Sequence, residues 1–282
     1  MRPDERSRYT EANRAAWNEV MPLHQRAARE KWDRAFAQPG YSCLPDDEVE
    51  LWRQVGLTGR AVAHLCCNNG VELLSLKDLG AGECVGFDIS DEAIREAQER
   101  AMLAGIACQY VRGDIYALDL VYYGAFDLVY FSAGALEWLP DLLGAFTQAA
   151  ALLRPGGQLF IHEIHPFAEM LARDGESDEL VHLAEPYFRQ EPYEDYGGLD
   201  YVGGSEHVSA LPQYCFVHTM ADIITAVLAS GMELQRLIES PRDISAGHRR
   251  LEAANLGVPL SFFLVAGRSG ERVPSGARGA AD

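Results

Sequence analysis

The sequence predicts a doubly wound α/β fold, in which a mostly parallel sheet carries helices on both faces. An apolar strand over 61–65 leads into a turn of small residues at 66–70 and then into a helix over 71–76. A second apolar strand at 84–88 ends in the carboxylate of Asp88. This order is the front half of a nucleotide-binding βαβ unit, and further apolar strands follow at 126–131 and 153–161.

The βαβ unit at 61–88 predicts a binding site for an adenosine cofactor. A tight turn of small residues lets a ligand approach the backbone, and a carboxylate such as Asp88 can accept both ribose hydroxyls. Dinucleotide enzymes mark this turn with G-x-G-x-x-G, and only Gly70 remains of the three glycines here. A pyrophosphate ligand is therefore not expected.

Residues 55–166 resemble the class I S-adenosylmethionine-dependent methyltransferases. In that family an acidic residue of the first strand is followed by x-G-x-G-x-G, and here the acid and two glycines are missing. Superposition sets the four positions at His64, Cys66, Asn68 and Gly70. Later segments agree in order, with Asp88 closing the second strand and Gly113, Asp114 and Ile115 closing the third. The resemblance implies the family's Rossmann-like fold, in which antiparallel strands at 232–239 and 261–268 complete a seven-stranded sheet.

The resemblance also implies S-adenosyl-L-methionine as the cofactor, with Asp88 holding the ribose and Asp114 and Ile115 holding and stacking the adenine. Asn68 tolerates left-handed backbone geometry better than most residues other than glycine, so the turn can survive. For His64, a cofactor contact and a strand-end histidine hydrogen-bonded to backbone are two open interpretations. The expected cofactor-binding residues of the core are His64, Cys66, Asn68, Asn69, Gly70, Asp88, Ile89, Asp114, Ile115, Ser132, Ala133 and Gly134.

Residues 1–50 are expected to form a helical lid. Positions 9, 13, 17 and 20 share one face of a helix over 9–20, and a second helix is expected to begin at or before Ala27. In the small-molecule methyltransferases that the chain resembles, such helices fold over the cofactor and exclude water. An amphipathic helix packed on the edge of the sheet is the alternative. The candidate cofactor contacts of the lid are Tyr9, Asn13 and Trp17, and His24 is a candidate substrate contact.

Glu163 and His165 follow the fifth strand at the edge where open α/β sheets bind ligands. Alternation places both on one face and His162 on the other. A carboxylate two residues from an imidazole can orient the ring and raise its basicity, so His165 is the leading candidate for a general base. The alternative is a strand-end histidine satisfied by backbone. The spacing differs from the H-E-x-x-H zinc motif, and no metal is expected.

Residues 167–213 form an insertion within the methyltransferase domain expected at 51–268. Tyrosines and carboxylates interleave there, and a loop this long in a compact domain is usually functional. Similar enzymes use it as a substrate wall, and its carboxylates favour an acceptor with an amine or hydroxyls, although they could simply be a solvated face. The expected substrate-binding residues are Tyr193, Tyr196, Tyr201 and Tyr214. His218, at the start of a helix capped by Thr219 and Asp222, is a second candidate for the base.

Composition narrows the partners. A net charge of −18 argues against nucleic acid and anionic membranes, and no apolar run approaches the length of a membrane span. The six cysteines show no C-x-x-C pair, which suits free thiols in a reducing compartment. A soluble cytoplasmic protein, monomeric or homodimeric, is expected, with a disordered tail at 269–282.

The sequence therefore predicts an enzyme that transfers the methyl group of S-adenosyl-L-methionine to oxygen or nitrogen of a small molecule, in a biosynthetic setting such as secondary metabolism. Two other classes stay open. The altered loop near the methionine end is compatible with non-methyl chemistry, such as cyclisation of the cofactor to azetidine-2-carboxylate. A non-catalytic adenosine-binding protein is the third class.

Overall fold

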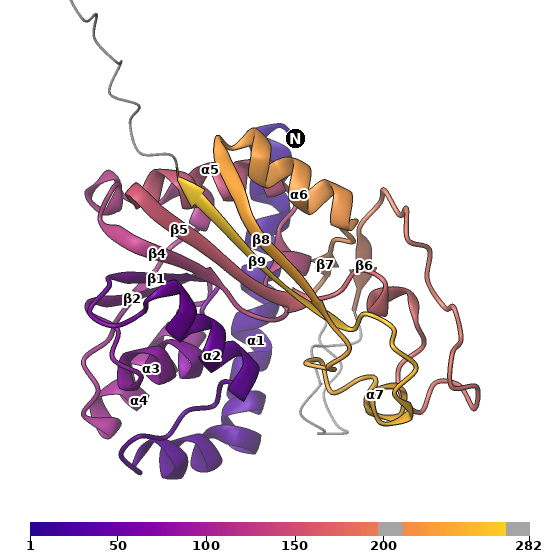
Figure 1. Cartoon of the computed structure of the whole chain (residues 1–282), viewed down its shortest axis with the longest axis horizontal. Helices are drawn as coiled ribbons and strands as arrows, with labels where there is room; N and C mark the ends of the chain where they lie inside the picture. Colours follow the sequence, from indigo (N-terminus) through magenta and orange to yellow (C-terminus); the bar gives the residue numbers. More distant parts are fainter. Residues whose placement is uncertain (197–210, 269–282) are drawn as a thin grey trace, which may run out of the picture.

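The computed structural model describes residues 1–196 and 211–268 (Figure 1). Its centre is a seven-stranded sheet in the order β3-β2-β1-β4-β5-β9-β8. Strands β1 to β5 pair in parallel, whereas β9 pairs antiparallel with β5 and β8. The expected fold class and the antiparallel last strands are confirmed. The strands are Val62–Leu65 (β1), Cys84–Asp88 (β2), Gln109–Arg112 (β3), Phe126–Phe131 (β4), Leu153–Ile164 (β5), Met232–Ser240 (β8) and Ser261–Arg268 (β9).

Helices cover both faces of the sheet because its strands are apolar on both sides. Val62 of β1 packs into one core with Trp52 and Leu73, while the next residue, Ala63, packs into a second core with Phe146. Such alternation is what a doubly wound sheet requires. The first core lies under α2 (Asp46–Val55), α3 (Val71–Asp78) and α4 (Asp91–Ala104), and the second under α5 (Leu142–Leu152) and α6 (Met220–Ala229).

The N-terminal segment is one helix, α1 (Pro3–Phe36), so the expected division into two helices is wrong. Pro22 lies inside it, although an interior proline typically costs about 3 kcal/mol. The flanking residues Val20, Met21 and His24 are all buried. Packing of this face outweighs the local helix-breaking tendency. Figure 1 shows α1, in indigo, running past the sheet from the side of α6 to that of α3 and α4.

The insertion after β5 is partly described. Its strand β6 (Tyr193–Asp195) pairs antiparallel with β7 (Gln213–Cys215), which begins at the last residue of the insertion. Tyr201 and the expected tail at 269–282 lie outside the described residues. The lid boundary expected at residue 50 falls within α2. The remaining short helices are η1 (Ile115–Ala117), η2 (Leu120–Tyr122), η3 (Leu136–Trp138), η4 (Ala168–Met170) and α7 (Arg249–Ala254).

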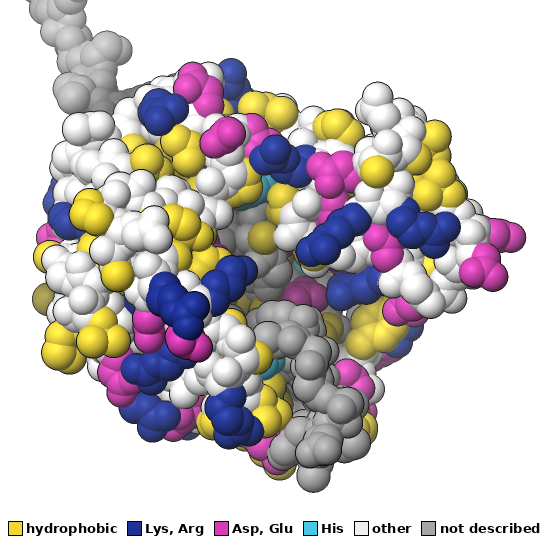
Figure 2. Space-filling view, turned by 90° about the horizontal axis from the view of Figure 1, so that it is seen from below, with side chains coloured by type: hydrophobic (Ala, Val, Ile, Leu, Met, Phe, Trp, Pro, Cys, Tyr) yellow, Lys and Arg dark blue, Asp and Glu magenta, His cyan; other side chains and the backbone are white. Residues whose placement is uncertain are grey.

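The surface, the cysteines and the helix lengths bear on the expectations from composition. Basic and acidic side chains are interspersed on the face shown in Figure 2, and that face is hollowed near its centre. All six cysteines are free, as expected. Among the described residues, no helix combines the length and the apolar character needed to cross a membrane.

Candidate active site

The loop between β1 and α3 has left-handed backbone geometry at three residues. The angle φ is 55° at Cys66, 46° at Asn68 and 76° at Gly70. These are the three positions at which the resembled family has glycine. Residues other than glycine in this region cost about 1–3 kcal/mol each, and they concentrate at binding sites. The loop therefore keeps the shape of a glycine loop although two of its residues carry side chains.

Gly70 ends this loop as the N-cap of α3. A Cβ atom added there would lie 2.5 Å from the ring of Tyr110. The hydroxyl of Tyr110 donates a hydrogen bond to the Gly70 carbonyl at 2.8 Å. Glycine is thus required by the backbone angle and by the close approach of the ring.

Asp88, at the carboxyl end of β2, holds the same loop. Its Oδ2 accepts from the backbone N–H of Asn68 at 2.8 Å, and its Oδ1 accepts from that of Ser90 at 2.9 Å. Burial raises the pKa of this carboxyl. A carboxylate has about four lone-pair sites, so these bonds leave acceptor capacity for a ligand.

Helix α1 lies across the carboxyl ends of β2 and β3. Thr10 Oγ1 donates to Asp114 Oδ2 at 3.3 Å, and Ser90 Oγ donates to Asn18 Oδ1 at 2.8 Å. Asp114 also accepts from the backbone N–H of Tyr116 at 2.9 Å. The expected positions of ribose and adenine are therefore next to α1.

The three expected cofactor contacts of α1 have protein partners. Both amide atoms of Asn13 bind the backbone of Tyr214, with Nδ2 donating at 2.9 Å and Oδ1 accepting at 2.7 Å. Tyr9 packs edge-on against Tyr214, and Trp17 packs against Trp138 with ring centroids 5.4 Å apart. The amide of Asn13 thus joins α1 to β7, a use that the helical pattern did not indicate. His24 is buried beside Trp17.

His64 is fully buried at the end of β1. Its Nε2 is hydrogen-bonded to Ser132 Oγ at 3.0 Å, and its ring stacks on Tyr130. Burial lowers the pKa of this histidine to about 3, so the ring is neutral. The expected hydrogen bond is made, but to a side chain of the loop after β4 and not to backbone.

Glu163 and His165 do not form the expected pair. The carboxylate of Glu163 accepts from the backbone N–H groups of Gly134 at 2.6 Å and Leu136 at 2.9 Å. Because β4 and β5 are parallel neighbours, the loop after β4 passes over the end of β5 and presents its amides to Glu163. Burial raises the pKa of Glu163 to about 7. Glu163 therefore shapes the loop expected beside the methionine part.

His165 has both ring nitrogens engaged elsewhere. Its Nε2 is hydrogen-bonded to Glu239 at 2.9 Å, and its Nδ1 accepts from the backbone N–H of Phe167 at 3.0 Å. The prediction that Glu163 orients His165 is wrong, because the ring is hydrogen-bonded to Glu239 of β8 instead. Burial lowers the pKa of His165. Its role as a base stays a prediction.

His218 contacts the segment that follows β4. Its Nε2 is hydrogen-bonded to the carbonyl of Leu139 at 2.9 Å, and burial lowers its pKa. The expected capping box is confirmed, because Thr219 and Asp222 exchange hydrogen bonds at the start of α6. The cap begins α6 directly after His218.

The tyrosines of the insertion bind its own carboxylates. Tyr196 and Tyr214 both donate to Glu194, at 2.7 Å and 3.1 Å, and Tyr193 donates to Glu185. Much of this hydrogen bonding is exposed. The carboxylates expected either to contact substrate or to face solvent are therefore partners of the tyrosines. Contact of Tyr193, Tyr196 and Tyr214 with substrate stays a prediction.

A cavity of about 490 Å³ opens beside the loop after β4. Its wall includes Ser132 and Ala133 of that loop, together with Glu48, Glu72 and His162. The sequence argument missed these last three residues as site residues. Alternation did set His162 on the face opposite Glu163, but the acidic run at 46–48 gave no sign that Glu48 turns inward.

Glu48 and His162 are joined by a buried hydrogen bond of 2.7 Å between Oε2 and Nδ1. Oε1 of Glu48 accepts from Trp52 Nε1 at 3.1 Å and from the Tyr130 hydroxyl at 2.6 Å. Within the described part of the chain, His162 Nε2 is buried without a hydrogen-bond partner. The Nε2 atom of His162 on the cavity wall is therefore available to a ligand.

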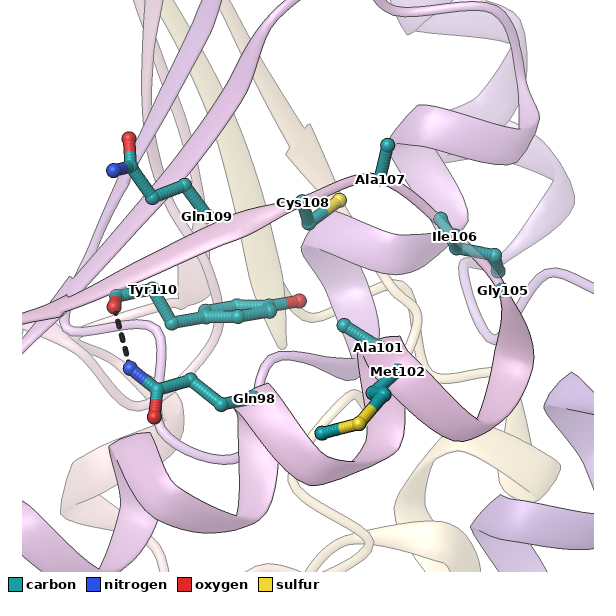
Figure 3. A pocket seen from close by; sticks show the side chains of 9 residues that line it. All are labelled: Gln98, Ala101, Met102, Gly105, Ile106, Ala107, Cys108, Gln109 and Tyr110. Atoms are coloured by element: carbon teal, nitrogen blue, oxygen red, sulfur yellow. Dashed lines mark hydrogen bonds between the residues drawn. The ribbon is translucent and has the colours of Figure 1, made fainter.

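A second hollow lies at the other edge of the sheet. It is lined by residues 105–110 and by Gln98, Ala101 and Met102 of α4 (Figure 3). These residues lead into β3 from its amino end, whereas α/β sheets bind ligands at the carboxyl ends of their strands. This hollow is therefore separate from the candidate site.

Comparisons with known proteins agree with the geometry. A family model described as "Methyltransferase domain" matches residues 62–157. Ubiquinone biosynthesis O-methyltransferase from Ralstonia nicotianae is 33% identical over 109 residues, covering 39% of this chain and 45% of that protein. The protein of the same name from Xanthomonas euvesicatoria is 28% identical over 135 residues, covering 48% of this chain and 56% of that protein. The chain thus spans about half the length of these relatives.

Solved structures share the fold over more of the chain. An S-adenosylmethionine-dependent methyltransferase from Mesorhizobium loti has a TM-score of 0.57 and 23% identity, covering 78% of this chain and 96% of that one. The [4+2]-cyclase SpnF has a TM-score of 0.56 and 15% identity, covering 91% of this chain and 95% of that one. At these identities the likeness is one of fold.

Sheet order, left-handed loop and terminal carboxylate define a nucleotide-binding α/β protein of the methyltransferase type. Residues 62–157 match a methyltransferase domain, and the fold is shared with an S-adenosylmethionine-dependent methyltransferase. The residues fit that family's cofactor at the adenosine end, because Asp88 keeps free acceptor capacity and Asn68 Oδ1 is buried without a partner among the described residues. At the methionine end, neutral His64 stands where the family has a carboxylate.

Proposed function

We propose that the protein transfers the methyl group of S-adenosyl-L-methionine to an oxygen or nitrogen atom of a small molecule. The observation that carries this proposal is the left-handed loop at 66–70, hydrogen-bonded to Asp88 at the carboxyl edge of the sheet. Ligands of open α/β folds bind at this edge. The O-methyltransferase name of the matching relatives supports oxygen as the acceptor atom.

The cofactor supplies a methyl group on a positively charged sulfur, which is a good leaving group. In this proposal Asp88 binds the ribose hydroxyls, while Asp114 and Ile115 contact the adenine. Helix α1, joined to Ser90 through Asn18 and to Asp114 through Thr10, closes over them and excludes water. Positioning and exclusion of water then contribute most of the rate enhancement.

We propose His218 as the base that removes a proton from the acceptor. It contacts the loop after β4 through Leu139, whereas both ring nitrogens of His165 are already engaged. A base of this kind contributes about 10²- to 10⁴-fold to turnover. His218→Ala should therefore lower kcat far more than cofactor affinity and remove the acid limb of the pH–rate profile. If His165→Ala shows these effects instead, the assignment moves to His165.

The proposed setting is a cytoplasmic enzyme, monomeric or homodimeric, that acts on a small molecule. The insertion and α1 meet through Asn13 and Tyr214, and so would enclose an acceptor of limited size. The net charge of −18 disfavours a nucleic acid acceptor.

The experiment is incubation with methyl-labelled S-adenosyl-L-methionine and a panel of small phenols, alcohols and amines, followed by mass spectrometry. Label in an acceptor together with S-adenosylhomocysteine is the expected result. Methylthioadenosine without a labelled acceptor would instead show cyclisation of the cofactor, the second candidate, which the altered residue His64 favours. Binding without turnover of any compound would contradict both.

A further inference from the structure

The methionine end of the site needs a partner for a positive charge. The methionine part of the cofactor carries an α-ammonium group, and His64 occupies the position of the family's carboxylate. His64 is buried and neutral, and its Nε2 is already hydrogen-bonded to Ser132. Nδ1 of His64 has no hydrogen-bond partner among the described residues, but a neutral ring carries no charge to balance an ammonium that has left water, so a carboxylate must do so.

Glu72 is a carboxylate of the cavity wall that the described residues leave without a side-chain partner. It lies in the first turn of α3 and lines the same cavity as Ser132 and Ala133, the residues expected beside the methionine part. Among the described residues, no other side chain is hydrogen-bonded or ion-paired to it. Loss of hydration raises the pKa of Glu72 to about 7, although its own backbone N–H and the charge of Arg100 act in the opposite direction.

The other charged groups of the cavity wall have partners or are exposed. Glu48 accepts three hydrogen bonds, from Trp52, Tyr130 and His162. Asp243 accepts from the backbone of His248 at 2.8 Å. Arg242 is paired with Asp47 at 2.8 Å. Glu252 lies on α7 and is exposed. Apart from the exposed Glu252, these contacts leave the half-buried Glu72 as the carboxylate of the described wall that has no side-chain partner.

His162 supplies a second acceptor. Trp52 can only donate to Oε1 of Glu48, which also lies 2.6 Å from the Tyr130 hydroxyl, and in an ionised Glu48 the other oxygen, Oε2, can only accept from His162. His162 therefore donates through Nδ1, and its Nε2 keeps a free lone pair. This nitrogen belongs to a side chain that is 2% exposed and lines the cavity. Stacking on Phe263, with centroids 4.0 Å apart, fixes the ring.

We propose that Glu72 and His162 bind the α-ammonium group of the cofactor's methionine part, in place of the carboxylate missing at His64. An ammonium has three N–H donors, and this wall offers it one carboxylate and one ring nitrogen. The positive charge neutralises Glu72, whose own burial is otherwise unfavourable. The inference rests on the proposed use of S-adenosyl-L-methionine.

The test is calorimetric binding of S-adenosyl-L-homocysteine and of its analogue that lacks only the α-amino group, to wild type and to Glu72→Gln. Loss of a hydrogen bond to a charged group corresponds to a weakening on the order of 10- to 100-fold. Glu72→Gln should weaken the binding of S-adenosyl-L-homocysteine by this factor and leave the affinity for the analogue without the α-amino group unchanged. His162→Gln should show the same selectivity, and Glu72→Asp should restore part of the affinity.

Glu252→Gln is the matched control, since it removes a carboxylate from the exposed rim of the same cavity and should alter neither affinity. Thermal unfolding of each variant shows whether it is folded. Equal weakening for both ligands, or none for either, would overturn the inference while leaving the proposed cofactor intact. Failure of wild type to bind S-adenosyl-L-homocysteine would overturn the cofactor proposal and the inference with it.

Discussion

The carboxylate of Asp88 at the end of β2 accepts a hydrogen bond of 2.8 Å from the backbone N–H of Asn68, in the loop after β1. Asn68 is one of two residues other than glycine in that loop with positive φ. The same carboxylate thus shapes the loop and faces the expected ribose position, so structure and binding are coupled at this residue.

Asp88→Ala should abolish measurable binding of S-adenosyl-L-homocysteine. The substitution removes the acceptor for two ribose hydroxyls, each bond contributing about 1.5–3 kcal/mol, and it also frees the loop. Calorimetric titration measures the effect. Asp119→Ala is the control, because Asp119 caps η2 through the backbone N–H of Val121 in the same way but on the exposed surface. Near-normal affinity of the Asp88 variant would mean that the ribose binds elsewhere.

Asn68→Ala should lower the free energy of unfolding by about 1 kcal/mol, because alanine tolerates left-handed geometry less well than asparagine. Asn68→Gly should not lower it, since glycine adopts this conformation freely. Urea unfolding measures both. Asn69→Ala is the control, as the neighbouring asparagine has no positive φ. Equal losses in all three variants would show that the backbone angle at residue 68 is not the cause.

Glu137→Gln should stabilise the protein at alkaline pH and have little effect in acid. Burial raises the pKa of Glu137 from 4.5 to about 8. The folded chain therefore keeps a proton that the unfolded chain loses, and stability falls as the pH rises between these two values. Glutamine cannot ionise, so it removes this loss of stability at alkaline pH.

We expect a gain of several kcal/mol, at most about 5, for Glu137→Gln at about pH 9 and less than about 1 kcal/mol at about pH 5, in urea titrations at both values. The exposed Glu50, changed to glutamine, should show no such pH dependence. A gain of the same size at both pH values would contradict the ionisation argument.

Asn13→Ala should loosen α1 from β7. It leaves the backbone N–H and C=O of Tyr214 without their partner, at a cost of about 1–3 kcal/mol for each unsatisfied group. Hydrogen exchange in the first half of α1 should accelerate, and affinity for S-adenosyl-L-homocysteine should fall. Arg34→Ala, which breaks an exposed ion pair with Glu30 near the end of the same helix, should change neither. Faster exchange with unchanged affinity would show that α1 packs on the domain without contributing to cofactor binding.

Much of the fold could be predicted because it is encoded locally. Apolar runs defined β1, β2 and β4, the alternation of side chains required two cores, and the short polar turns marked the carboxyl ends of the strands. Asp88 and the turn at 66–70 were predictable for the same reason, since a carboxylate and a turn that directly follow strands must lie at one edge of a parallel sheet.

The partners of the polar side chains were decided only by the tertiary structure. Glu163 binds the loop after β4 and not His165, His165 binds Glu239, and His162 meets Glu48 from a helix more than a hundred residues earlier. Periodicity places a side chain on a face, but hydrogen-bond energy depends on distances of a few ångströms between segments remote in sequence. The same holds for α1, which runs unbroken through Pro22 because tertiary packing outweighs a local preference. The sequence by itself thus determined the sheet and its binding edge, and packing across the sheet decided which charges remain free for a ligand.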